Sequence, residues 1–108
     1  MEKPLEEEQS RLLREGSGRE CFVFARDHAD VDHEALQARV IEIGNAADCV
    51  HFAMFVPGAD VPSLQARVLE DGSPLDCEVF ASGVPGASRE ALLERRDRIE
   101  SERHRPMV

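Results

Sequence analysis

Apolar residues recur along the middle of the chain with the period of a helix. Four of them follow the spacing i, i+3, i+4, i+7, which places them on one helical face: Cys49, Phe52, Ala53 and Val56. A second stripe has the same period a few residues later: Val61, Leu64 and Val68. Pro57 and Gly58 separate the stripes and end the first helix, because proline disfavours a helical residue before it and glycine tolerates a turn. The pattern predicts a helical hairpin.

This hairpin recurs along the chain with a period of about 28 residues, within the range of tandem structural repeats. Residues 21–48 and 49–76 share 12 identities in 28 aligned positions without a gap. The same interval separates the members of several columns: Cys21, Cys49 and Cys77; Phe24, Phe52 and Phe80; Leu36, Leu64 and Leu92; Gly16, Gly44 and Gly72; Arg11, Arg39, Arg67 and Arg95. A fixed period of this size indicates a tandem array of one supersecondary unit.

Capping residues mark where the helices begin and end. Each unit opens on a capping box, in which a Ser or Asn precedes an acid by three residues: Ser17 and Glu20, Asn45 and Asp48, Ser73 and Asp76. The second helix of each unit has its own predicted cap: Asp32, Asp60 or Ser88. Gly44 and Gly72 follow the second helices, where we expect a left-handed residue to end them.

The prediction is therefore an all-α protein of one domain, residues 1–108, built as a right-handed stack of helical hairpins, an α-solenoid of about 3.5 repeats of 28 residues. Its units are an N-terminal capping helix (4–15) and three repeats (17–44, 45–72 and 73–103), the last of which includes a C-terminal capping helix. The charged last helix and the Glu-rich start suggest a complete short array. Such an arrangement resembles tandem helix–turn–helix repeat proteins such as ankyrin, tetratricopeptide and HEAT arrays, although the period matches none of these families. The resemblance implies an extended surface for a protein partner.

One alternative fold remains open at this point. Residues 64–70 and 75–81 alternate apolar and polar side chains around Asp71 and Gly72, which is also the pattern of a β-hairpin. A hairpin at 64–81 would give an α+β sandwich. We favour the helical array, because the alternative requires repeat-equivalent segments with shared residues to fold differently.

The charge and cysteine content indicate which binding partners and which covalent links to expect. The formal net charge of −9 argues against non-specific binding to nucleic acid or anionic lipid, which needs clustered Lys and Arg. No apolar run reaches the roughly 18 residues of a membrane span, so we expect a soluble, cytoplasmic protein. The three cysteines occupy equivalent positions, which lie about 8–10 Å apart in packed helices. A disulfide needs Cα atoms within about 7 Å, so we predict a buried column of free thiols.

The segment Asp27–Glu34 is the candidate for metal or acid–base chemistry. It holds several groups that can bind a divalent metal, the weak candidates being His28, Asp30 and His33. Their spacing matches no established motif, and Asp32 is already explained as a helix cap. His51 follows Cys49 by two residues, so the two side chains do not share a helical face and do not form a catalytic pair. The sequence therefore predicts no catalytic residues, no cofactor and no metal.

The arginine column allows two interpretations. A row of arginines on successive helices can grip a carboxylate-rich ligand. A structural role is favoured, in which each arginine pairs with nearby acids such as Glu42 or Glu70 and covers apolar surface with its stem.

Positions that differ between the repeats are free to carry specificity. The candidates for partner binding lie on the first helix of the middle repeat, which is apolar nearly all round, and on the first helix of the repeat before it: Phe22, Arg26, Val50, His51, Met54 and Phe55. We expect them to bind a protein partner, for which the acidic charge suits a basic protein, or a second copy of the chain. The predicted function is a non-catalytic interaction module: an adaptor, an inhibitor or a self-associating scaffold. Two alternatives remain: a metal-binding protein or metal-dependent hydrolase that uses Asp27–Glu34, and an acidic decoy of a nucleic-acid-binding protein.

Overall fold

The computed structural model describes residues 5–103, and this part of the chain is helical without any strand. Its helices, in chain order, are α1 (Leu5–Glu15), α2 (Gly18–Asp27), α3 (His33–Ile43), α4 (Ala46–Phe55), α5 (Val61–Asp71), α6 (Pro74–Gly83) and α7 (Arg89–Arg103). The alternative β-hairpin at 64–81 is wrong, because α5 and α6 occupy this segment. Helical capping at its centre accounts for the difference: Ser73 begins α6 directly after the end of α5.

The predicted capping boxes are present at the starts of α2, α4 and α6. In the first, the Ser17 hydroxyl accepts the N–H of Glu20 at 3.1 Å, and the Glu20 carboxylate accepts the N–H of Ser17 at 2.9 Å. Asp32 and Asp60 cap α3 and α5 by accepting the N–H three residues further along the chain. These side chains satisfy amide groups that a helix start leaves without intrahelical partners. The boundaries of the short helices therefore follow from local sequence.

The glycines act differently from the prediction. Gly44 and Gly72, after α3 and α5, have φ angles of −80° and −74°, so the expected left-handed conformation is wrong. Positive φ occurs instead at Gly58 and Gly86, 78° and 87°, in the Pro-Gly turns that follow α4 and α6. Gly44 is needed for space: a Cβ there would lie 2.6 Å from the carbonyl oxygen of Val40.

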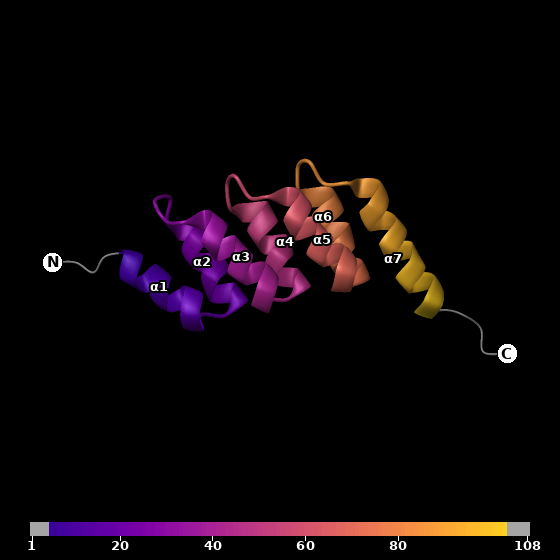
Figure 1. Ribbon diagram of the computed structural model, residues 1–108. Helices are drawn as coiled ribbons and strands as arrows, with labels where there is room; N and C mark the ends of the chain where they lie inside the picture. The colour runs from indigo at the N-terminus through magenta and orange to yellow at the C-terminus, as the bar shows by residue number, and fades with distance from the viewer. Residues whose placement is uncertain (1–4, 104–108) are drawn as a thin grey trace.

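Helices of the same kind lie beside one another. The even helices form one row, in which α2 contacts α4 and α4 contacts α6, and the odd helices α1, α3, α5 and α7 form a second row. Figure 1 shows the helices following one another from α1 at one end to α7 at the other, with the turns after α2, α4 and α6 along one edge. Each even helix also packs on the odd helix that follows it. The molecule is thus a two-row array of helices.

The core runs between the two rows. Its largest fully buried side chains include three of the predicted columns: Phe52 and Phe80; Leu36, Leu64 and Leu92; Cys21, Cys49 and Cys77. Val40 and Val68, at equivalent positions, are fully buried as well. All three thiols are free and buried, as predicted. Burial raises their pKa values, that of Cys49 to about 11, because a thiolate is poorly solvated in the core. No described helix is both long and apolar enough to cross a membrane.

Candidate protein-binding surface

Aromatic side chains meet on the even-helix row. The Phe22 ring of α2 lies 5.7 Å from the His51 ring and 6.2 Å from the Phe55 ring of α4, measured between centroids. His51 and Phe55 are 6.4 Å apart on α4 itself. The Arg26 guanidinium lies 5.4 Å from the Phe22 centroid, within the range of a cation–π contact. The structure therefore brings four of the six predicted binding residues into one cluster, which we call the Phe55 cluster.

The members of this set differ in how far solvent reaches them. Phe55 is 52% exposed, which is unusual for a phenylalanine in a domain with few aromatic residues. Arg26 is exposed, and His51 and Met54 are half-buried. Phe22 and Val50, at 4% and 3% exposure, belong to the core. A partner can thus reach Phe55 and its polar neighbours, while Phe22 supports the Phe55 ring from below.

Phe55 also borders a shallow groove of about 310 Å³ at the turn after α4. Residues of this turn and of the following one line the groove, and most of them are apolar: Val56, Pro57, Ala59, Val61 and Pro85. Met54 reaches towards α6, where a Cβ at Gly83 would lie 3.0 Å from its terminal methyl group. The exposed ring and the groove together form a continuous apolar surface of the kind that protein partners contact.

The loop Asp27–Glu34 is tied to the helix before it. Nδ1 of His28 lies 3.1 Å from the carbonyl oxygen of Phe24, and Nε2 of His33 lies 2.9 Å from that of Ala25. These contacts satisfy carbonyls at the end of α2. The carboxylate of Asp32 caps α3 by accepting the N–H of Ala35, as the sequence predicts.

The remaining candidates of this loop do not converge either. Asp27 accepts a 2.9 Å hydrogen bond from Nε of Arg26, which lowers the pKa of its carboxyl group. Asp30 is exposed. Within residues 5–103, no three His, Cys, Asp or Glu side chains gather in a geometry that could hold a metal ion. The chemistry-bearing groups of this loop serve the helix ends.

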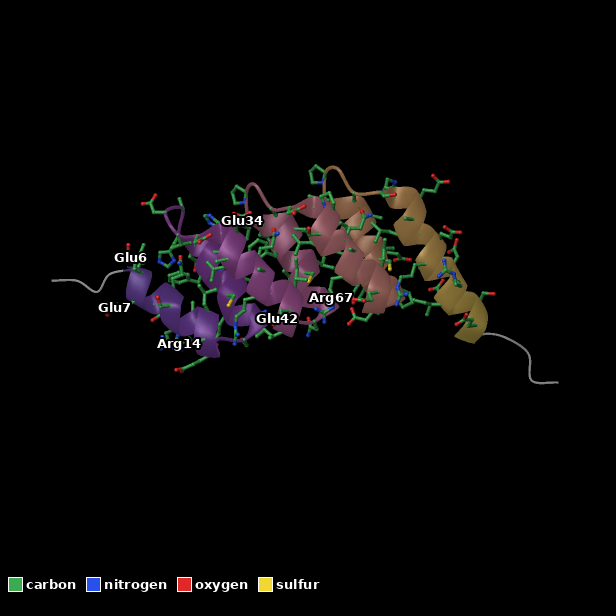
Figure 2. The ribbon with its side chains drawn as sticks, viewed as in Figure 1. Glu6, Glu7, Arg14, Glu34, Glu42 and Arg67 are labelled. Atoms are coloured by element: carbon green, nitrogen blue, oxygen red, sulfur yellow. The ribbon has the colours of Figure 1, made fainter. Side chains whose placement is uncertain are left out.

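The arginine column has a structural role: Arg11 and Arg67 pair with nearby acids, Glu8 and Asp71, but most bonds of the column go to backbone carbonyl oxygens, and in the described part of the chain Glu42 and Glu70 are not among its partners. Three of its members bind the carbonyl oxygen of a glycine 23 residues earlier: Arg39 binds Gly16 at 2.9 Å, Arg67 binds Gly44 at 2.7 Å, and Arg95 binds Gly72 at 2.9 Å. Each bond joins an odd helix to the end of the odd helix before it. Arg67, at the lower edge of the array in Figure 2, also donates to the Ile41 carbonyl and pairs with Asp71.

A second column runs in the opposite direction along the same helices. The side-chain oxygens of Gln9, Gln37 and Gln65 accept the backbone N–H of Asp32, Asp60 and Ser88, at 2.7, 2.8 and 2.7 Å. Each bond joins an odd helix to the start of the next one. This role was not predicted, although the three glutamines share the interval of the repeat. Together the arginine and glutamine columns form what we call the polar ladder.

Comparisons with known proteins add no relative. The chain matches no protein-family model, no curated protein and no solved structure. Its functional interpretation therefore rests on its own residues.

Proposed function

We propose that the chain is a non-catalytic protein-interaction module, built as a right-handed α-solenoid of about 3.5 such hairpin repeats. Two features support the solenoid: helices of the same kind contact one another along each row, and the polar ladder repeats its bonds from one unit to the next. Arrays of this kind present extended surfaces on which proteins dock.

One observation carries the binding role: Phe55 is largely exposed at the centre of the even-helix row. The equivalent positions of the neighbouring repeats hold Asp27 and Gly83, so stacking of the units does not call for an aromatic side chain there. An exposed ring supported by a buried one and bordered by an apolar groove is the arrangement of an interface anchor.

Charge favours a particular kind of partner. The chain carries a formal net charge of −9, which attracts a basic protein over distances of about 8–10 Å at physiological salt. Within the Phe55 cluster the cation Arg26 is already paired with Asp27, so it leaves little net positive charge to oppose such a partner. We therefore propose an anchor provided by Phe55 and steering provided by the net negative charge of the chain.

The test compares two matched variants of the full chain. Phe55→Glu removes the anchor, and Ile43→Glu makes the same change at a residue of similar exposure, 44%, on α3 of the odd row. Both sites are exposed, so neither substitution should unfold the protein, which circular dichroism checks. Proteins captured from a cell extract by the immobilised chain are identified, purified and titrated against all three forms by calorimetry.

We expect a captured partner to bind the wild type and Ile43→Glu alike, and to bind Phe55→Glu at least tenfold more weakly, as for loss of an interface anchor of about 2 kcal/mol. Light scattering after size exclusion detects the case in which the partner is a second copy. Equal binding to all three forms, or no binding partner at all, would contradict the proposal.

A further inference from the structure

A groove of about 380 Å³ lies along α1 and α2, at the end of the array where the described chain begins. Its floor is apolar and consists of Leu12, Val23 and Phe24. Its rim carries charges of both signs: Glu20 and Asp27 on α2, beside Arg11 on α1 and Arg19 on α2. No described helix lies over this groove, whereas the equivalent groove of the next repeat is covered. The covered groove of the next repeat therefore indicates what kind of structure this groove can bind.

The groove on α1 and α2 corresponds, one repeat of 28 residues later, to a groove on α3 and α4. Val23, Phe24 and Asp27 become His51, Phe52 and Phe55. In that second groove the occupant is the helix α2, whose Phe22 ring packs against His51 and Phe55. The same relation holds once more along the array, where α4 packs against α5 and α6. The groove on α1 and α2 therefore has the form of a helix-binding site.

The occupants inside the array show what such a helix must carry. The first turn needs a small residue, because Gly18 of α2 lies so close to Gly44 that a Cβ on it would be 2.6 Å from the Gly44 Cα. Four residues later comes a large apolar side chain, Phe22 in α2 and Val50 in α4, and both are buried. Four residues later again comes a long side chain, Arg26 or Met54.

The chain's own last even helix does not satisfy these requirements. In α6 the apolar position is held by Glu78, whose carboxylate is already 3.1 Å from the Arg96 guanidinium of α7. If a second copy continued the array, Glu78 would lie against Val23 and Asp27, where a carboxylate meets an apolar side chain and another carboxylate. Growth of the array by end-to-end stacking, with α6 of a second copy in this groove, is therefore disfavoured.

Charge specifies the third position of the occupant. Asp27 stands where the next repeat has Phe55, and Glu20 stands near the small first residue. A basic side chain eight residues after the small one would lie close to Asp27, because the equivalent residues of α4 and α6 meet: a Cβ on Gly83 would lie 3.0 Å from the terminal methyl group of Met54. There it would share the Asp27 carboxylate with Arg26. We propose that the groove on α1 and α2 binds an amphipathic helix of a partner protein that carries a small, a large apolar and a basic residue at intervals of four.

The lining of this groove includes no member of the Phe55 cluster, although Asp27 pairs with Arg26 of that cluster, so the two proposals are tested with different variants. The probe is a helical peptide with the sequence of residues 17–28, since α2 is the occupant of the equivalent groove. A lactam between side chains introduced as Arg19→Lys and Val23→Asp keeps the peptide helical, and both positions point away from α4 because they line the groove on the other side. Cys21→Ala in the peptide prevents oxidation. Binding of the fluorescent peptide to the full chain is followed by anisotropy.

A charge exchange provides the sharpest test. We expect saturable binding of the peptide, and Asp27→Arg in the protein should weaken it at least tenfold. A peptide with Arg26→Glu should restore binding to the Asp27→Arg protein, but it should not improve binding to the wild type. Val23→Arg in the protein, which fills the floor of the groove, should weaken binding by a similar factor. Leu75→Arg is the matched control: Leu75 is 66% exposed on α6 at the opposite end, so its replacement should leave binding unchanged.

Three results would overturn the proposal. They are no saturation up to about 1 mM peptide, binding that is insensitive to Asp27→Arg and to Val23→Arg, and binding that Leu75→Arg weakens as much as Val23→Arg does. Because Asp27 is exposed, its variant keeps the test decisive even if Val23→Arg fails to fold. Phe55→Glu should bind the peptide as the wild type does, and this result separates the groove from the Phe55 cluster.

Discussion

Replacing Arg67 by methionine tests whether the polar ladder holds successive repeats together. Arg67 lies on α5, and its guanidinium donates to the carbonyl oxygens of Gly44 and Ile41 near the end of α3. It also pairs with Asp71 at 3.2 Å, and its side chain is only 18% exposed. Methionine keeps an unbranched apolar stem over the surface that arginine covers, so the change removes mainly the polar contacts.

The expected loss follows from these contacts. A hydrogen bond that involves a charged group contributes about 1.5–3 kcal/mol to stability, and the exposed pair with Asp71 contributes under about 1 kcal/mol. The freed carbonyls lie close to the end of α3, where water can replace part of what they lose. We therefore expect the free energy of unfolding to fall by about 2–3 kcal/mol. The urea dependence of unfolding should also become shallower, because weaker coupling between repeats lets the two halves of the array unfold less cooperatively.

Urea unfolding followed by circular dichroism at 222 nm measures both quantities, and it suits a chain without tryptophan or tyrosine. Arg11→Met is the matched control, because Arg11 occupies the same repeat position but pairs with Glu8 on its own helix at 2.6 Å. That exposed pair predicts a loss of under about 1 kcal/mol. Equal losses for the two variants would refute the view that bonds from arginine to the preceding helix end stabilise the stack.

Two further predictions concern the other half of the ladder and the buried thiols. Gln37→Leu should lower the free energy of unfolding in urea by about 1–3 kcal/mol, because leucine cannot accept the Asp60 N–H as the buried Gln37 side chain does. Gln65→Leu should lower it less, because the bond of Gln65 is exposed, and a larger loss there would contradict this reasoning. The raised pKa of Cys49 means that the folded state holds the thiol proton more tightly than the unfolded state does. The contribution of this thiol to the free energy of unfolding should therefore be fully present below about pH 9 and be lost as pH rises towards 11. Cys21 and Cys77 contribute to the same fall, because burial raises their pKa values too, whereas the chain has one lysine and no tyrosine to titrate in this range. Cys49→Ala should therefore show a flatter, but not a flat, pH dependence in the same urea assay.

The helices and the core could be predicted because they depend on local signals and on the repeat. A capping box such as Ser17 with Glu20 acts within one turn, and a Pro-Gly pair ends a helix wherever it occurs. Once the interval of the repeat is known, one amphipathic hairpin fixes the core positions of all the others. Such information lies entirely in short stretches of sequence, so it is visible without the structure.

The polar contacts between repeats could not be predicted in the same way. The bond of Arg67 to Gly44 depends on the distance and rotation between α5 and α3, which local propensities do not determine. The charged neighbours Glu42 and Glu70 are closer in sequence and suggested the wrong partners. The prediction for Gly44 was wrong for a related reason. Its lack of a side chain allows close packing against Val40 and Gly18, and the contact with Gly18 depends on how two helices pack, which local sequence does not determine.

The two rows of the array divide stability and recognition between them. The odd helices are joined to one another by arginine and glutamine side chains, and α3 and α5 each carry both, so a substitution there removes hydrogen bonds between successive units. The even helices α2 and α4 meet through side chains that differ from one unit to the next, such as Phe22 and Phe55. Since their chemistry can change without breaking the ladder, the even row and its turns are where a binding surface can vary at small cost in stability. The exposed ring of Phe55 lies in this row, and so does one wall of the groove on α1 and α2.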